Sequence, residues 1–480
     1  MLKIYNTLNA RKEIFKPIND NNVNMYVCGV TVYDKCHVGH ARSAVVFDTA
    51  RRYMQYRGYN VTFVKNFTDI DDKIIKKSNE TGISWQEITE KYIREHDYDM
   101  NKLNVMKPNY EPKATEYIDE MIELCSQLIE NGNAYEIDGD VYFRVKSFHG
   151  YGKLSNRDIE ELKAGTRIEV RDNKEDPLDF ALWKKSKEGE PGWQSPWGMG
   201  RPGWHIECSV MSSKILGLPF DIHGGGKDLI FPHHENEIAQ SETSCGCQFA
   251  KYWMHNGFVN INKEKMSKSL GNFFTIRDII EEFEPESLRY FLLTTHYRSP
   301  LDFSEDKLIE AESALDRIYT LIDSMESYKA GKKGKKLIDE VSSIKGNFEK
   351  DFTEAMDDDF NTAAALSVIF EYIRKINVLL ENKPDTESFE SLKNQFDGIL
   401  KIVRSTLGIA VKSPEDWFRA NLSIPENELL EKINQRNEHR KNKEFDKADS
   451  IRDELKEKGI ELLDTPEGTK YRARRVHRVE

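Results

Sequence analysis

Apolar residues in the first 115 positions alternate between the spacing of strands and the spacing of helices. Short apolar runs at 23–27 and 61–64 predict buried strands, and the pattern over 41–56 predicts a helix between them. Strands that alternate with helices favour a parallel, doubly wound sheet. The sequence therefore predicts an α/β domain that begins within residues 1–115.

Residues 201–300 return to this alternation after an interruption. A helix is predicted over 206–216, followed by a strand over 220–226 that runs into a glycine loop. Pro232 suits the first turn of the next helix, because the N–H that it lacks is not needed there. We expect this segment to complete the domain that the N-terminal residues begin.

The interruption, residues 116–200, is predicted to be an insertion. It contains a helical pattern over 117–131 and a hairpin pattern over 135–145. The stretch 172–203 is rich in Pro, Gly, Trp and charge and has little periodicity. We therefore expect residues 116–200 to form a connective unit.

Beyond residue 300 the apolar positions step by three and four, as on the buried face of a helix. Residues 301–412 are predicted to form an α-helical bundle. Its stripes are Leu308, Ala311, Leu315, Ile318, Ile322 and Met325, then Phe389, Leu392, Phe396, Ile399 and Val403. Residues 413–480 predict a small mixed α/β unit, with one helix at about 426–458 and a strand at 460–463.

The composition is that of a soluble globular chain of 480 residues with a formal net charge of −12. No apolar run of about 18 residues predicts a membrane span, and no signal-peptide core is found, so a cytoplasmic protein is expected. The six cysteines are few and unevenly spaced. Disulfides are therefore not expected, and metal-binding or catalytic thiols are. The net charge argues against a wholly basic nucleic-acid coat protein but allows a local RNA surface at the basic clusters 329–336 and 470–478.

One candidate site is a metal centre. His233 and Glu237 are spaced i, i+4, so they share one face of a helix, while Cys208 is predicted on another helix. Cys28 ends the first strand, and two thiolates, an imidazole and a carboxylate suit Zn²⁺. Spacing alone leaves rivals, which are the thiol pair Cys245 and Cys247 and the imidazole of His234.

A second candidate is a phosphate site at the turn between the first strand and the first helix. His37 and His40 lie at this helix start, where free N–H groups and the positive end of the dipole suit phosphate. Gly39 lets a ligand approach the backbone closely. Lys265 and Lys268 lie on a polar loop, where they could neutralise charge on a leaving pyrophosphate. A bare Lys-x-x-Lys pair also fits an exposed basic loop, so spacing leaves both interpretations open.

Together the motifs His37-Val-Gly-His40 and Lys265-Met-Ser-Lys-Ser269 resemble the signature pair of the class I aminoacyl-tRNA synthetases. Position 38 is Val where that signature often has Ile, and both fill the same apolar space. Further stretches, spread over nearly the whole chain, resemble the cysteine-specific branch of the family. They are Cys28-Gly-Val-Thr-Val-Tyr-Asp34, Asn66-Phe-Thr-Asp-Ile-Asp-Asp-Lys73, Gly203-Trp-His-Ile-Glu-Cys-Ser209, the run 223–237, Met356-Asp-Asp-Asp-Phe-Asn-Thr362 and the run 445–472.

The resemblance implies a ligase that activates L-cysteine with ATP and then passes the cysteinyl group to the 3′-terminal adenosine of tRNA(Cys). It implies a Rossmann-like doubly wound parallel-sheet catalytic domain at 1–115 and 201–300, split by the connective insertion 116–200. A helical tRNA-binding bundle at 301–412 and an anticodon-binding domain at 413–480 would follow, and a monomer is expected. Candidate contacts for the anticodon are Arg472, Arg474 and Arg475, together with Tyr471, which stands where Trp is expected but can still stack on a base.

The resemblance also implies roles for the site residues. The catalytic residues would be His37, His40, Lys265 and Lys268, and ATP with Mg²⁺ would contact His37, Gly39, His40 and Lys268. One zinc ion would be held by Cys28, Cys208, His233 and Glu237. Zinc binds thiolate far better than a neutral hydroxyl, so it would separate cysteine from serine without an editing domain. Candidates for the amino-acid pocket are Gly29, Thr31, Trp204, which could close it, and Asp228, which could receive the ammonium group.

Three other functions fit part of the sequence. A paralogue that joins activated cysteine to a small amine would share the zinc and ATP sites but lack the tRNA-reading end. A zinc hydrolase built on 233–237 leaves the lysine loop and the histidine turn unexplained. In a non-enzymatic RNA-binding protein, the zinc set would be only structural.

Overall fold

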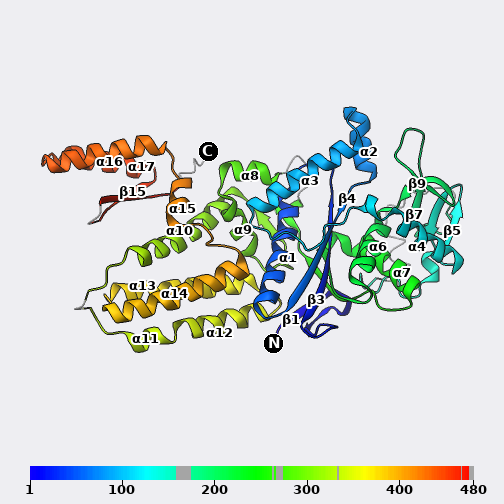
Figure 1. Cartoon of the computed structure of the whole chain (residues 1–480), viewed down its shortest axis with the longest axis horizontal. Coiled ribbons are helices and arrows are strands. Elements are labelled where there is room, and N and C mark those ends of the chain that lie inside the picture. Colours follow the sequence, from blue (N-terminus) through cyan, green and yellow to red (C-terminus); the bar gives the residue numbers. More distant parts are fainter. Residues whose placement is uncertain (158–173, 262–263, 266–273, 332–333, 466–467, 475–480) are drawn as a thin grey trace.

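The computed structural model is elongated, with a parallel sheet near its middle (Figure 1). The insertion lies toward one end of the molecule, and the helical bundle and the C-terminal unit lie toward the other. The structure describes residues 1–157, 174–261, 264–265, 274–331, 334–465 and 468–474. Across these ranges, no helix combines the length and the apolar character that crossing a membrane requires.

The central sheet has the strand order β11-β10-β3-β4, and all its neighbouring strands are parallel. Its strands are β3 (Asn22–Thr31), β4 (Asn60–Thr68), β10 (Phe220–Gly226) and β11 (Ala250–Asn256). Helix α1 (Val38–Tyr56) packs on one face of this sheet, and α6 (Trp204–Leu216) packs on the other. The prediction of a parallel, doubly wound sheet made from both halves is therefore confirmed.

Side-chain alternation along β3 separates the two faces of this sheet. Val23, Met25 and Val27 join the apolar core beneath α1, whereas Tyr26 and Cys28 belong to the core beneath α6. The remaining elements of the α/β region lie around this sheet. They are β1 (Lys3–Asn6), β2 (Arg11–Ile14), α2 (Asp72–Thr81), α3 (Trp85–Lys102), α7 (Glu235–Cys245), β12 (Val259–Ile261), β13 (Glu264–Lys265), α8 (Ile276–Glu282), α9 (Pro285–Leu293) and β14 (Leu301–Phe303).

The insertion contains α4 (Ile118–Glu130) and an antiparallel sheet of order β5-β6-β7-β9-β8. The predicted hairpin is β5 (Ala134–Ile137) and β6 (Asp140–Phe143), joined through left-handed Asp138 and Gly139. The stretch after residue 172, which has little periodicity in sequence, contains β7 (Phe180–Lys185), β8 (Trp193–Ser195) and β9 (Gly198–Pro202). These strands are short and gain their order from pairing with β6 and with each other, which single-strand periodicity does not reveal.

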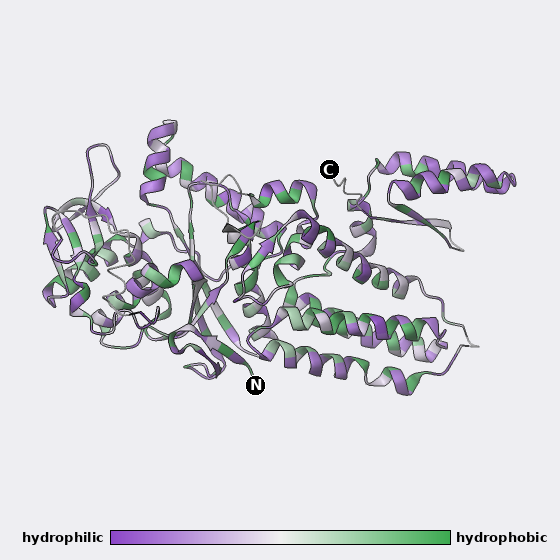
Figure 2. Cartoon of the chain, turned by 180° about the vertical axis from the view of Figure 1, so that it is seen from behind, coloured by the Kyte–Doolittle hydropathy of each residue, from purple (hydrophilic) through white to green (hydrophobic). Residues whose placement is uncertain are grey.

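The predicted bundle is formed by α10 (Glu305–Ser327), α11 (Ile338–Ser342), α12 (Ile344–Asp357), α13 (Thr362–Glu381) and α14 (Thr386–Leu407). Hydrophobic and hydrophilic residues alternate along each long helix (Figure 2), and both predicted stripes are buried. Asn361 caps the start of α13, and left-handed Gly408 ends α14.

The C-terminal unit holds α15 (Pro414–Ala420), α16 (Glu426–Lys441), α17 (Phe445–Glu457) and the hairpin of β15 (Ile460–Thr465) with β16 (Gly468–Ala473). The prediction of one helix over 426–458 is wrong, because the chain turns at left-handed Lys443. The turn brings α17 against α16 and buries Leu429 and Leu455 in one small core. Arg472 donates to Asp323 of α10 at 2.6 Å, so this candidate anticodon contact is engaged in docking the hairpin. Arg475 lies outside the described residues.

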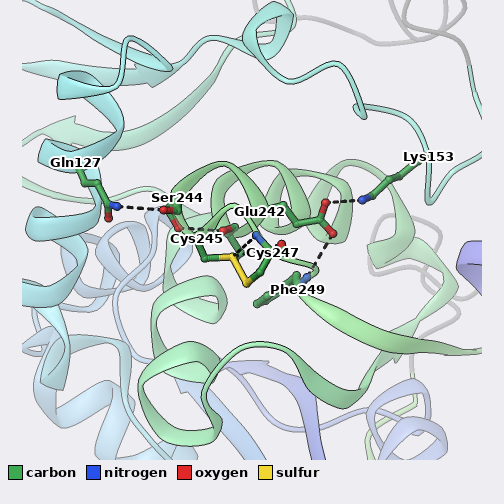
Figure 3. The surroundings of a disulfide bond; sticks show 8 residues. Gln127, Lys153, Glu242, Ser244, Cys245, Cys247 and Phe249 are labelled. Atoms are coloured by element: carbon green, nitrogen blue, oxygen red, sulfur yellow. Dashed lines mark hydrogen bonds and ion pairs between the residues drawn. A yellow bond between two sulfur atoms is a disulfide. The ribbon is translucent and has the colours of Figure 1, made fainter. Parts of the chain in front are cut away.

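Cys245 and Cys247 are joined by a disulfide (Figure 3), so the expectation of no disulfide is wrong for this pair. Helix α7 ends at Cys245, and Gly246 in the left-handed conformation turns the chain back, which brings the two Cα atoms to 5.2 Å. Cys28, Cys36, Cys125 and Cys208 are free and buried. The paired cysteines are therefore no longer rivals for a metal centre.

Candidate metal centre and active site

Four side chains from separate parts of the chain meet beneath the C-terminal end of β3. Cys28 comes from β3, Cys208 from α6, His233 from the short helix Ile230–His234, and Glu237 from α7. Their ligand atoms all lie within 4.8 Å of one another, and all four residues are buried. Cys28 Sγ lies 3.5 Å from Cys208 Sγ and 3.4 Å from Glu237 Oε1, and His233 Nε2 lies 2.9 Å from Glu237 Oε1. The four predicted ligands thus form one cluster whose size suits a single metal ion.

The charges in this cluster suit a divalent cation. Burial opposes charge on the Cys208 thiol, but the hydrogen bond from Cys28 and the neighbouring His233 lower its pKa to about 6. Burial also disfavours charge on Glu237, yet His223 and His233 hold the pKa of its carboxyl well below the usual value. Burial raises the pKa of the Cys28 thiol well above its usual value. These surroundings favour a thiolate at Cys208 and a carboxylate at Glu237, and both are good metal donors.

Two histidines that we did not assign from the sequence orient the predicted ligands. His205 Nδ1 lies 2.9 Å from His233 Nδ1, and His223 Nε2 lies 2.7 Å from Glu237 Oε2. Partners of this kind fix the ring and carboxylate orientation of metal ligands. Their positions could have indicated both histidines. His223 lies in β10 opposite Tyr26 of the neighbouring strand, close to Cys28. His205 is three residues before Cys208 in the sequence.

His234 is close enough to form an alternative set. Its Nε2 lies 3.3 Å from Cys28 Sγ, and the ligand atoms of Cys28, His223, His234 and Glu237 also lie within 4.8 Å of one another. The Nδ1 atom of His234 is engaged with His255 at 2.8 Å. The imidazole of His234, which spacing left as an alternative ligand, therefore lies in the same cluster. Both possible ligand sets include Cys28 and Glu237.

The segment before α7 is a short helix, Ile230–His234, whose regular geometry is interrupted at Phe231 (φ −138°, ψ 132°). Helix α7 follows directly at Glu235, so Pro232 lies in the first turn after the interruption, in agreement with its prediction. The predicted glycine loop also belongs to β10, whose strand runs to Gly226. A Cβ at Gly224 would come within 2.3 Å of the Phe47 ring of α1. Glycine is required there because β10 and α1 approach closely.

His37 and His40 lie where the phosphate site was predicted, at the first turn of α1. His37 is the N-cap residue of α1, and its Nδ1 accepts a hydrogen bond from Gly39 N at 3.0 Å. Its ring stacks on the ring of His40, with the ring centroids 3.7 Å apart. Val38 N donates to Phe274 O, so the chain that follows the lysine motif lies beside this turn. Lys265 lies in β13, and Lys268 lies outside the described residues.

The four candidates for the amino-acid pocket differ in their surroundings. Trp204 is 40% exposed and stacks on His233 with ring centroids 4.3 Å apart. Thr31 is half-buried at the end of β3, opposite Thr68. A Cβ at Gly29 would lie 1.5 Å from Asn66 O, so β4 requires glycine there. Asp228 is exposed in the turn after β10.

Comparison with known families gives two matches. Residues 14–313 match the family described as tRNA synthetases class I (C) catalytic domain, and residues 351–411 match the DALR domain. The first match covers the central sheet, the insertion and the buried cluster, and the second covers the core of the helical bundle.

Individual proteins agree with these matches. A protein named Cysteine--tRNA ligase from Thermodesulfovibrio yellowstonii is 52% identical over 485 residues, covering 98% of this chain and 100% of its own length. Another of the same name from Geobacter metallireducens is 53% identical over 484 residues, with the same coverage. Among solved structures, Mycobacterium tuberculosis methionyl-tRNA synthetase in complex with methionyl-adenylate aligns with a TM-score of 0.61 at 14% identity, covering 85% of this chain and 94% of its own. That likeness supports the fold.

Proposed function

The chain belongs to the cysteine–tRNA ligase family of class I aminoacyl-tRNA synthetases, and on this premise we propose that it charges tRNA(Cys) with cysteine. The cysteine carboxylate attacks the α-phosphorus of ATP, giving cysteinyl-adenylate and releasing pyrophosphate. The cysteinyl group then passes to the 3′-terminal adenosine of tRNA(Cys). The observation that carries the proposal is a buried Cys, Cys, His and Glu cluster in a chain that matches its named relatives over 98% of its length.

The metal that suits the cluster is Zn²⁺, held by Cys28, Cys208, His233 and Glu237. The donor set supports this choice, because two sulfurs, an imidazole and a carboxylate match zinc better than they match magnesium or calcium. When bound, zinc offers a position to the thiolate of the substrate, which a neutral hydroxyl fills poorly. His205 would keep His233 Nε2 turned toward the ion, and Trp204 would cover the imidazole from solvent. These residues would together select cysteine over serine.

ATP with Mg²⁺ would lie at the start of α1. The positive dipole end of this helix start favours the phosphates, and Gly39 leaves the backbone open to them. His37 and His40 would contact the triphosphate as charge develops. Lys265 and Lys268 would neutralise the departing pyrophosphate. Beside the metal cluster, Gly29, Thr31 and Asp228 would complete the amino-acid pocket.

We also propose a function for each domain of the chain. Residues 1–115 and 201–300 would form the catalytic domain, 116–200 the connective insertion, 301–412 the tRNA-binding bundle, and 413–480 the anticodon-binding domain. One chain supplies all four proposed zinc ligands, which supports action as a monomer. Its role in protein synthesis supports a cytoplasmic location.

The test is cysteine-dependent exchange of pyrophosphate into ATP, run with cysteine and with serine, with zinc measured on the same samples. We expect exchange with cysteine only and about one zinc ion per chain. Cys208→Ser should lose both the ion and the exchange, whereas Cys125→Ser, which removes a buried free thiol outside the cluster, should keep both. Exchange that is equally fast with serine would contradict the proposed selection.

A further inference from the structure

A cavity of about 200 Å³ lies on the α1 side of the central sheet, on the face opposite the metal-ligand cluster. Its walls come from α1, β4, α3 and the segment 105–111 that follows α3. Strand β3 separates the two sites: Val27 lines the cavity, while the next residue, Cys28, belongs to the other face. The inner wall is apolar, with buried Val27, Phe47 and Met100. None of the residues to which we assign a role in aminoacylation lines this cavity.

Polar atoms without partners line this cavity. Among the residues that the structure describes, Arg51 Nε and His96 Nε2 are buried and make no hydrogen bond. His96 is 4% exposed and Arg51 is 6% exposed. Lys65 is half-buried, its Nζ makes no hydrogen bond or ion pair with any described residue, and burial lowers its pKa. Buried donors without partners are costly, and a half-buried ammonium gains from an anionic partner, so a ligand that supplied acceptors would be stabilised here.

The carboxylates that line the cavity do not satisfy these cations. Each of these carboxylates already has a partner other than Arg51 and Lys65. Asp48 accepts from Arg52 at 2.8 Å and from Arg289 at 2.5 Å. Glu111 pairs with Lys107 at 3.3 Å, and Asp97 lies 3.3 Å from His96 Nδ1. Arg51 uses its two terminal nitrogens on Lys107 O and Asn109 Oδ1, which are neutral acceptors. Two cations, Arg51 and Lys65, therefore face the cavity without a carboxylate partner among the described residues.

We propose that this cavity is a binding site for a small monocarboxylic acid with a flat apolar body, separate from the sites for cysteine, ATP and tRNA. The carboxylate would lie between Lys65 and Arg51, where charge-assisted hydrogen bonds are strong. The apolar body would lie against Phe47, Phe63 and Met100. The volume is below that of sites for drug-sized ligands, so the ligand would have about ten non-hydrogen atoms.

The experiment uses the full chain and 4-fluorobenzoate as the probe, observed by fluorine NMR. We expect saturable binding with a Kd of about 1 mM or tighter. The neutral isostere 4-fluorobenzamide should bind about tenfold more weakly, and Lys65→Met should weaken the benzoate by a similar factor. Saturating cysteine and ATP should leave the binding unchanged. Lys91→Met, which removes an exposed lysine of α3 outside the cavity lining, is the matched control.

A second variant, Met100→Trp, fills the cavity without removing a charge and should also abolish binding. If Lys65→Met does not fold, the Met100→Trp variant tests whether the ligand binds in this cavity. Circular dichroism establishes the folded state of each variant. The proposal is overturned by absence of saturable binding to the folded wild-type chain, by equal affinity for the benzamide, or by displacement with cysteine or ATP. Unchanged affinity in the folded Met100→Trp variant overturns it too.

Discussion

The Nδ1 atoms of His205 and His233 face each other at 2.9 Å, and this contact leaves Nε2 of His233 pointing at Glu237. Burial lowers the pKa of His205 well below its usual value, which favours a neutral ring, and a neutral ring can accept a proton from His233 at Nδ1. This contact fixes which nitrogen of His233 is available to a metal ion.

From this geometry we expect His205→Ala to lower the affinity for zinc about 10- to 100-fold, the usual cost of losing a partner that orients a metal ligand. Competition with a chromogenic chelator measures the affinity directly. His149→Ala is the control, because His149 is an exposed histidine on the insertion. Unchanged zinc affinity in His205→Ala would show that His233 is oriented by other contacts.

The disulfide at the end of α7 should be independent of the metal centre. The double variant Cys245→Ser, Cys247→Ser removes sulfurs that lie outside both candidate ligand sets. We therefore expect its zinc content and cysteine-dependent exchange to equal those of the wild type. Metal analysis of the purified variant measures this, and loss of the ion would return this pair to the candidate ligands.

Local patterns in the sequence indicated candidate ligands, since Cys28 ends an apolar strand and the spacing of His233 and Glu237 is one helical turn. The resemblance to the synthetase family, and not spacing, selected these residues with Cys208 from the alternatives. The orienting residues had no such local pattern, since His205 and His223 meet their partners only after α6 and β10 pack against β3 and α7. The same limit explains the missed strands after residue 172, which depend on pairing with β6. The end of the helix near Lys443 could not be predicted, because the residues around it are polar. They show no apolar periodicity whose interruption would mark a helix end.

Arg289 should be important for stability. Its buried guanidinium donates to Asp48 of α1 at 2.5 Å, and it also donates to Leu103 O and to Leu407 O, the last residue of α14. Arg289→Met would leave Asp48 with one fewer partner and these buried carbonyls unsatisfied. We expect a loss of about 3–5 kcal/mol in the free energy of unfolding, measured by urea denaturation. The control Arg374→Met, at an exposed position of α13, should change it by less than about 0.5 kcal/mol.

The C-terminal hairpin should depend on pH through Asp464. The guanidinium of Arg436 donates to both carboxylate oxygens, at 2.5 and 2.7 Å, and holds the pKa of Asp464 below its usual value. Because the folded pKa is depressed, the stabilisation is present above pH about 4 and is lost as the pH falls through the folded pKa. Asp464 is 45% exposed, so we expect Asp464→Asn to cost only about 0.5–1 kcal/mol at pH 7.

Hydrogen exchange of the β15 and β16 amides measures this difference. The gap between wild type and Asp464→Asn should narrow below pH about 4 and close at lower pH. Asp397→Asn, on the exposed side of α14, should show no such dependence. A gap that stays constant across this pH range would contradict the assignment to this ion pair.

Trp204 should affect cysteine binding more than ATP binding. Its ring stacks on His233 at a centroid distance of 4.3 Å and is 40% exposed, so it covers the imidazole on the side open to solvent. Losing an aromatic contact of this kind costs about 0.5–1.5 kcal/mol, and Trp204→Ala should therefore raise the cysteine KM about 2- to 10-fold. The KM for ATP should stay close to the wild-type value, since the start of α1 is unchanged. Trp204→Phe should restore most of the cysteine affinity, and Trp193→Ala in the insertion should alter neither constant. Equal rises in both KM values would assign Trp204 a general structural role instead of a place over the amino-acid pocket.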